Sequence, residues 1–313
     1  MKLYLAPLEG ITSYIYRKAL YQCFDGFDKY FIPFIRAKQN LNFSGREKKD
    51  ISPENNSGMY AVPQILTRNA DDFLRTANQL KEYGYQEVNL NLGCPSKTVV
   101  TKGCGAGFLA RPDELEQFLD RIYSKTDMKI SVKTRLGMEN AEEFPRLMEI
   151  YNRFPMEELI IHPRVQKDFT PNLEIFKESL KLSKHSICYN GDIFSADDFK
   201  RIHAQFPNVE CFMMGRGILA DPSLAREIRG GKAADQSDIR RFHDLLYHTY
   251  REEVSGDRNV LFKMKEIWFY LAPMFADSKK YAKKIKKSER CVVYESAVNE
   301  LFANCRFTGT QSK

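Results

Sequence analysis

The sequence EVNLNLGCP, residues 87–95, begins with the pattern of a β-strand and ends with residues that break it. Apolar residues alternate with asparagines, as expected where successive side chains point to opposite faces. The final GCP ends the strand, and a glycine-rich segment, KGCGAG, follows at residues 102–107. Reacting groups in α/β barrels lie just past the ends of strands, which is the place of Cys94. The alternative is that Cys94 is an ordinary small apolar residue.

Similar short apolar segments recur along the first 230 residues, and a helical pattern follows most of them. Such alternation predicts parallel strands with crossover helices, and eight units of this length predict a (β/α)8 TIM barrel. A doubly wound sheet is the alternative, but no GxGxxG motif follows the first strand. Residues 38–58 are predicted to form a long polar, functional loop. The predicted strands are residues 3–5, 30–33, 60–65, 87–92, 129–133, 158–162, 186–189 and 211–214.

The pattern changes after the paired glycines 230 and 231, because only helical periodicity is present beyond them. We therefore predict a barrel domain at residues 1–230 and a small all-helical domain at residues 236–313. A lysine-rich helix, KKYAKKIKK, is predicted at residues 279–287. The last helix is predicted to share an apolar face made of Val292, Val293, Ala297 and Leu301.

Composition places the chain among soluble globular proteins, with 43% hydrophobic and 28% charged residues. No N-terminal signal and no 18-residue apolar run are present, so we expect a cytoplasmic protein without a membrane partner. Seven scattered cysteines without a CxxC pair favour neither a disulfide framework nor a zinc site. We expect no bound metal and, by default, a monomer.

The chain is basic, with a formal net charge of +7. Residues 232–313 hold 16 Lys and Arg against 11 Asp and Glu, so most of the excess lies in the predicted helical domain. Such a surface suits a polyanion such as nucleic acid, although a solvated basic surface is the alternative.

Polar or glycine residues end or follow most of the predicted strands. In a barrel these strand ends meet at one mouth, where we expect the residues to form a site. The segment APLEG, residues 6–10, follows the first strand. The candidates at the other strand ends are Gln64, Asn91 and Cys94, Lys133 and Arg135, His162 and Arg164, Asn190, Gly191 and Asp192, and Gly215 and Arg216.

The last two strand ends suggest a phosphate site. Glycines after strands seven and eight let backbone approach a ligand, and a helix expected to start near Asp221 follows. Arg216 would add a charged contact. A lysine and an amide, Lys133 and Gln64, would suit the electron-rich edge of a reduced flavin. Cys94 has no histidine nearby in sequence, which fits a proton donor better than a nucleophile.

Several motifs together resemble one family, the tRNA-dihydrouridine synthases, and most of all its short bacterial branch. They cover nearly the whole chain and come in the family's order. They are APLEGIT at residues 6–12, NLGCPSKTV at 91–99, SVKTRLG at 131–137, NGDI at 190–193, MGRG at 214–217 and KEIWFYL at 265–271.

The resemblance implies a TIM barrel that binds FMN, uses NADPH as the reductant and reduces the uracil ring of tRNA to 5,6-dihydrouridine. It makes Cys94 the proton donor to C5. It implies that FMN is bound by residues at ten positions: Pro7, Leu8, Gln64, Lys133, His162, Asn190, Gly191, Asp192, Gly215 and Arg216. It implies that the target uridine or its neighbouring nucleotides are held by Asn91, Arg135 and Arg164. The basic helical domain, with Lys279, Lys280, Lys283 and Lys284, would grip the RNA.

One segment departs from the family pattern. Where the family has HGRT followed by tyrosine, this chain has HPRVQKDF, with Pro163 in place of glycine and Phe169 near the aromatic position. Proline stiffens the turn next to Arg164. Three alternatives stay open: a dihydrouridine synthase acting on ribosomal RNA, an FMN barrel acting on a small molecule, and a non-catalytic RNA-binding protein.

Overall fold

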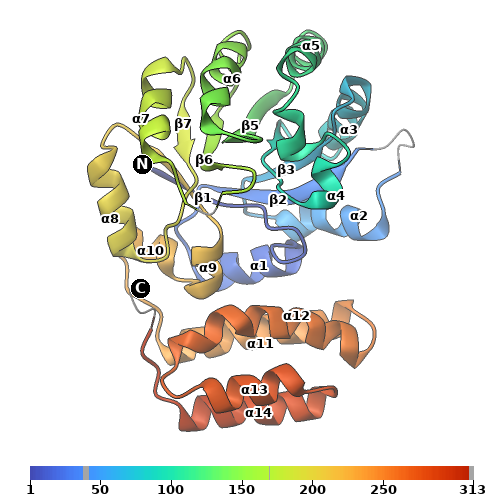
Figure 1. Cartoon of the computed structure of the whole chain (residues 1–313). Helices are drawn as coiled ribbons and strands as arrows, with labels where there is room; N and C mark the ends of the chain where they lie inside the picture. Colours follow the sequence, from blue (N-terminus) through green and yellow to red (C-terminus); the bar gives the residue numbers. More distant parts are fainter. Residues whose placement is uncertain (38–41, 169, 310–313) are drawn as a thin grey trace. The chain divides into compact units, whose positions relative to one another are not determined.

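The computed structural model describes residues 1–37, 42–168 and 170–309, and its eight strands form a closed barrel in chain order (Figure 1). Neighbouring strands are parallel from the first pair to the seventh. The predicted TIM barrel is confirmed, and the doubly wound sheet is excluded. The strands are β1 (Lys2–Leu5), β2 (Lys29–Arg36), β3 (Ala61–Leu66), β4 (Glu87–Leu92), β5 (Lys129–Gly137), β6 (Leu159–Val165), β7 (Ile187–Tyr189) and β8 (Cys211–Met214).

Helices connect the strands, and four more follow the barrel, as predicted. The helices are α1 (Tyr14–Cys23), α2 (Gly45–Ile51), α3 (Ala70–Glu82), α4 (Lys97–Val100), α5 (Pro112–Tyr123), α6 (Phe144–Tyr151), α7 (Leu173–Leu182), α8 (Ala196–Gln205), α9 (Arg216–Ala220), α10 (Leu224–Ile228), α11 (Gln236–Glu253), α12 (Asp257–Leu271), α13 (Lys279–Lys287) and α14 (Cys291–Asn304). Short 3-10 helices are η1 (Pro53–Asn56), η2 (Gly105–Phe108), η3 (Ala141–Glu143) and η4 (Ala272–Met274).

The chain forms two compact units. Unit 1 comprises Met1–Pro7, Asp28–Gly191 and Phe206–Met213, and unit 2 comprises Leu8–Phe27, Asp192–Gln205 and Met214–Lys313. Unit 1 holds the barrel strands, apart from the last residue of β8, together with α2 to α7. Unit 2 holds α1, α8, α9 and α10 with the four C-terminal helices. The predicted domains divide the chain by sequence position, and that division stays a prediction.

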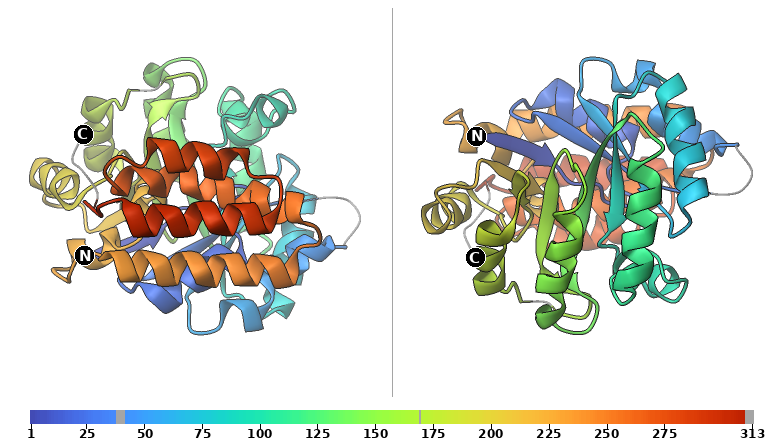
Figure 2. Two further views of the ribbon diagram at one scale, coloured as in Figure 1. Left: turned by 90° about the horizontal axis from the view of Figure 1, so that it is seen from below. Right: turned by 90° about the horizontal axis from the view of Figure 1, so that it is seen from above.

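In unit 1, β4 is buried along its whole length, although the sequence alternates apolar and polar residues. Its asparagines bond to side chains of β3 and β5, as a barrel interior requires, and its apolar residues point the other way, toward the helices. Helices α3, α5, α6 and α7 pack in sequence order (Figure 2, right). One buried core cluster contains Tyr4, Ala6, Phe31, Val62, Ile160, Cys188, Cys211 and Met213.

In unit 2, the four C-terminal helices pack against one another (Figure 2, left), and three of them share a buried polar centre. The Tyr294 hydroxyl accepts a hydrogen bond from the Trp268 indole at 2.8 Å and lies 2.6 Å from Nε2 of His243. Burial lowers the pKa of His243, which favours its neutral form. These contacts join α11, α12 and α14.

The predicted apolar face of α14 is wrong in part. Val292 and Val293 are 68% and 52% exposed, whereas Ala297 and Leu301 are buried. The helix begins at Cys291, and its 3.6-residue period turns Cys291 inward and the two valines toward solvent.

Other predicted boundaries are also wrong, and β2 continues past the predicted residue 33 to Arg36. β5 continues to Gly137 and β6 to Val165, so Lys133 lies inside its strand and Arg164 belongs to β6. The predicted polar loop at 38–58 contains α2, which a capping box of Ser44 and Glu47 begins. Residues 38–41 of that loop and Phe169 lie outside the described residues.

Candidate active site

The barrel register brings several predicted side chains together in unit 1. Asn91 pairs with Lys133 across β4 and β5, and Arg135 pairs with His162 across β5 and β6. Gln64 on β3 is hydrogen-bonded to Asn91, whose Nδ2 donates to Oε1 of Gln64 at 2.7 Å. The predicted convergence of residues from β3, β4, β5 and β6 is therefore present in the structure.

The loop that carries Cys94 is held by Asn91. Oδ1 of Asn91 accepts the backbone N–H groups of Gly93 at 3.1 Å and Cys94 at 2.9 Å. Gly105 has φ of +56°, and a Cβ there would lie 2.8 Å from the Cys94 carbonyl oxygen. This close approach requires glycine and explains the glycine-rich segment. The Cys94 side chain remains partly accessible.

Lys133 has a lowered pKa, as lysines at functional sites often do. Burial of its ammonium group, together with repulsion from Arg135, lowers its pKa to about 7, while Cys94 and Cys188 act in the opposite direction. A lysine that titrates near neutral pH can supply or withhold a positive charge at the mouth of the barrel.

Arg135 and Arg164 are both buried, at 9% and 7% exposed. The Arg135 guanidinium donates to the carbonyl oxygens of Gly93 at 2.8 Å and Val165 at 3.0 Å. Arg135 therefore ties the Cys94 loop to the end of β6. These two hydrogen bonds stabilise the loop, a role of Arg135 that the sequence did not predict.

Cys104 differs from Cys94 in its surroundings. Its thiol donates to the Lys102 carbonyl at 3.7 Å, and burial raises its pKa, although Arg68 opposes that effect. A thiol with a raised pKa is a poor nucleophile at neutral pH. These surroundings favour a structural rather than a catalytic role for Cys104.

The predicted phosphate segments belong partly to each unit. In unit 1, Asn190 donates to the Met213 carbonyl at 2.9 Å, and a Cβ on Gly191 would clash with the Tyr189 side chain. In unit 2, Arg216 donates to Asp192 at 2.7 Å. The helix expected from near Asp221 corresponds to α10, which begins at Leu224, and the sequence did not predict the short helix α9, which Gly215 directly precedes.

After the first strand, the backbone groups of Leu8 form hydrogen bonds within their own turn. The Leu8 N–H donates to the Thr12 hydroxyl at 2.8 Å, and the Leu8 carbonyl accepts the N–H groups of Ile11 and Thr12. Pro7, the preceding residue, has no N–H to donate.

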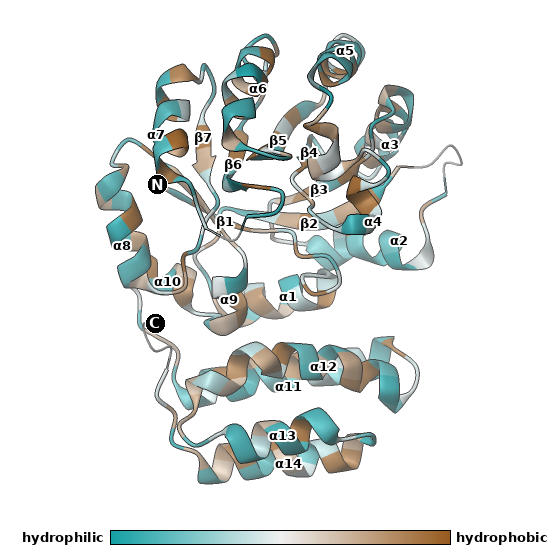
Figure 3. Ribbon diagram, viewed as in Figure 1, coloured by the Kyte–Doolittle hydropathy of each residue, from teal (hydrophilic) through white to brown (hydrophobic). Residues whose placement is uncertain are grey.

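The lysine-rich helix has the predicted bounds and is mostly hydrophilic (Figure 3). Lys279, Lys280 and Lys283 are exposed, while Lys284 pairs with Glu300. A groove of about 1180 Å³ runs between α12 and α13, and the exposed Phe262 and Phe269 line it together with Lys279, Lys280 and Lys283.

Sequence reasoning missed a group of buried polar residues at the opposite strand ends: Lys29, Glu87, Asn89, Ser131 and Glu158. The Lys29 ammonium contacts Glu87 at 2.8 Å and Glu158 at 3.1 Å. The signal was present in the sequence, because Glu87 and Asn89 share the strand phase of Asn91.

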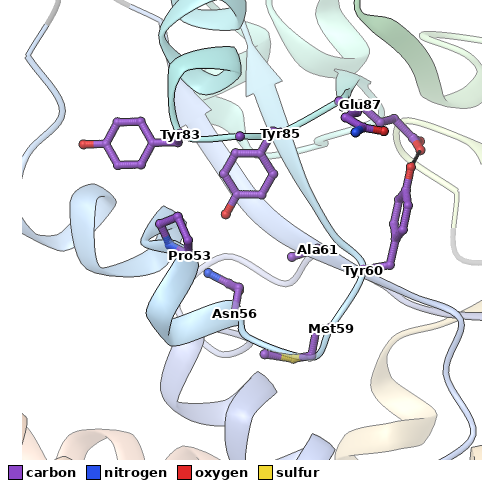
Figure 4. A pocket seen from close by; sticks show the side chains of 10 residues that line it. Pro53, Asn56, Met59, Tyr60, Ala61, Tyr83, Tyr85 and Glu87 are labelled. Carbon is purple, nitrogen blue, oxygen red and sulfur yellow. Dashed lines mark hydrogen bonds between the residues drawn. The ribbon is translucent and has the colours of Figure 1, made fainter.

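A small cleft of about 340 Å³ lies near this buried group, at the amino ends of β3 and β4 (Figure 4). Tyr83, Tyr85 and Pro53 line it, and the Tyr60 hydroxyl donates to Glu87 at 3.2 Å. Burial and the Glu87 carboxylate raise the pKa of Tyr60 to about 12. The cleft is thus separate from the residues predicted at the carboxyl ends.

The family model for dihydrouridine synthase (Dus) matches residues 4–303. The chain belongs to the dihydrouridine synthase family. It is 27% identical over 235 residues to tRNA-dihydrouridine synthase B of Pasteurella multocida, covering 72% of this chain and 68% of that protein. It is 27% identical over 248 residues to the tRNA-dihydrouridine(16) synthase of Ralstonia nicotianae, covering 76% and 75%.

Solved structures similar to this dihydrouridine synthase family member include an old yellow enzyme homologue from Zymomonas mobilis and morphinone reductase. The TM-scores are 0.56 and 0.55, at 12% and 10% identity. Each match covers 77% of this chain, with 92% and 90% of the respective structures. At such low identity these likenesses support the barrel fold alone.

Within the described residues, no helix is long and apolar enough to span a membrane. The same residues contain no group of three or more His, Cys, Asp or Glu side chains that could hold a metal ion. The expected cytoplasmic location, monomeric state and absence of metal stay predictions.

Proposed function

We propose that this dihydrouridine synthase reduces uridine in tRNA to 5,6-dihydrouridine, with FMN as its flavin and NADPH as the reductant. One observation carries the proposal: Asn91 fixes the Cys94 loop on one side and bonds to Gln64 on the other. A proton donor and a flavin-binding amide are thereby held by one side chain. The relatives named as tRNA-dihydrouridine synthases support the choice of tRNA.

The residues at the carboxyl strand ends fit FMN in their chemistry. Gln64 and Asn190 supply amides, Lys133 supplies a positive charge that titrates near pH 7, and His162 lies on the strand next to Lys133. When bound, FMN would supply the hydride for C6 of uracil. Arg216, Asp192 and Gly215 in unit 2, with Gly191, would hold its phosphate end. Pro7 and Leu8 are proposed to contact it through backbone atoms other than the Leu8 N–H, which already bonds to Thr12.

Cys94 is proposed to give a proton to C5 of the uracil ring. Its loop is fixed from two sides: the side-chain Oδ1 of Asn91 accepts the Cys94 N–H, and the Arg135 guanidinium donates to the Gly93 carbonyl. A positioned acid of this kind needs no nearby general base. Arg164 and Arg135 are proposed to lie next to the uridine or its neighbours, and the target base must leave its stack to reach them.

The lysines of α13 are proposed to bind the RNA backbone. Replacing Lys279, Lys280, Lys283 and Lys284 together by serine should reduce the magnitude of the slope of log affinity against log salt by about 3, since each of four phosphate contacts contributes about 0.7 to 0.9. Salt-dependent tRNA binding measures this change. A control variant replaces four exposed lysines of unit 1, namely Lys125, Lys177, Lys181 and Lys184. Equal slopes for the two variants would contradict the assignment.

Cells with and without the gene test the proposed substrate. We expect dihydrouridine to disappear from particular tRNA positions in the deletion strain and to return when the gene is restored. Loss from ribosomal RNA instead would identify the other RNA substrate. No change in either RNA, with a flavin-containing purified protein, would point to a small-molecule substrate.

A further inference from the structure

A continuous chain of side-chain hydrogen bonds runs through unit 1, along the inside of the barrel. The Ser131 hydroxyl donates to Oε1 of Glu87 at 2.9 Å, and Nδ2 of Asn89 donates to Ser131 at 3.0 Å. Nε2 of Gln64 donates to Oδ1 of Asn89 at 2.7 Å, and Asn91 donates to Gln64 at 2.7 Å. We call these five residues the polar chain. Each of them is 6% exposed or less.

The two ends of the polar chain fix its direction. At one end the Glu87 carboxylate can only accept hydrogen bonds, so Ser131 must donate to it. At the other end the backbone N–H groups of Gly93 and Cys94 can only donate, so Asn91 must present its oxygen to them. Between these ends, each amide has one orientation that satisfies both neighbours. Turning any amide over would leave buried polar groups without hydrogen bonds.

The carboxylate end is anchored by charge. Lys29 bonds to Glu87 at 2.8 Å, and Tyr60 donates to the same oxygen at 3.2 Å (Figure 4). Burial alone would lower the pKa of Lys29, but Glu87 and Glu158 outweigh that effect and raise it. Lys29 therefore stays charged, and its ammonium group and the Tyr60 hydroxyl both donate to Glu87.

We propose that Glu87, Asn89 and Ser131 are positioning residues, which set the amide orientation of Gln64 and Asn91 from the far end of the barrel. None of the three lies at the carboxyl strand ends where substrate is expected. Through Asn91 they fix the Cys94 loop, and through Gln64 they present a defined amide edge to the flavin. The role toward Gln64 and the flavin rests on the proposed function. The role toward the Cys94 loop does not.

The test is Ser131→Ala, which removes the link between Glu87 and Asn89. Two quantities are measured: the affinity of the apoprotein for FMN, by quenching of flavin fluorescence, and amide hydrogen exchange in the peptide containing Gly93 and Cys94. The variant removes both hydrogen bonds of the Ser131 hydroxyl. We expect FMN to bind about tenfold more weakly and the two amides to exchange about tenfold faster, an effect on the scale of one buried hydrogen bond. Ser131→Cys keeps the volume with weaker hydrogen bonds and serves if the alanine variant does not fold.

Ser179→Ala is the matched control. Ser179 is a fully buried serine of unit 1 whose hydroxyl donates only to Phe176 in its own helix. It should change neither quantity. Unchanged exchange in the Ser131 variant would overturn the proposal whatever the flavin affinity. Faster exchange with unchanged FMN affinity would overturn the role toward Gln64. If the wild-type protein binds no FMN, the proposed function fails, and hydrogen exchange alone decides whether the polar chain positions the Cys94 loop.

Discussion

Cys94→Ala should lower the rate of uridine reduction by about 100- to 10,000-fold, the range that a positioned general acid contributes. FMN affinity should stay the same, because the side chain is proposed to face the base and the Asn91 contacts are made by backbone N–H groups. Single-turnover reduction of unmodified tRNA by the prereduced variant measures the step directly.

Cys104→Ala is the control for the Cys94 variant. It removes the Cys104 thiol, whose pKa is raised by burial in the neighbouring glycine-rich segment. We expect wild-type turnover from it. A Cys94→Ala enzyme with full activity would show that another group protonates C5.

Lys133→Met should abolish tight FMN binding and change how the stability of the apoprotein depends on pH. The pKa of Lys133 is about 7 in the folded chain against an ordinary value of 10.5. Between these values the unfolded chain binds one more proton than the folded chain. The free energy of unfolding should therefore rise with pH in that interval, by up to about 1.4 kcal/mol per pH unit.

Urea unfolding of the apoprotein at pH 7 and pH 9 measures this term. The wild-type protein should gain about 2 kcal/mol more than Lys133→Met between the two conditions, since methionine cannot titrate. Below pH 7 both states of the lysine are protonated and the two pH dependences should run parallel. The same rise in both proteins would mean that Lys133 is not buried as a titrating group.

The barrel was predictable because hydrophobic periodicity and strand-end polarity are local signals. The order of elements, the lysine-rich α13 and the place of Cys94 all follow from such signals. Which environment the two faces of β4 occupy could not be predicted from such local signals. Its asparagines look like a solvent face in sequence, and only closure of the barrel makes that face an interior.

The contacts of the site depended on tertiary structure. That Arg135 bonds to two carbonyls, and that Asn91 joins Gln64 to the Cys94 loop, follow from strand register and loop path, which periodicity does not encode. The face of α14 was misjudged for a related reason. Adjacent valines look like a core pair, but the helix phase is set by Tyr294, which bonds to His243 and Trp268.

The most direct measurement uses the purified protein, FMN, NADPH and an unmodified tRNA transcript, with nucleosides analysed by mass spectrometry after digestion. We predict that dihydrouridine, heavier than uridine by two hydrogens, forms with the wild-type protein. It should not accumulate with Cys94→Ala on the same timescale. A wild-type protein that holds FMN, oxidises NADPH and leaves every uridine of tRNA unreduced would contradict the central claim.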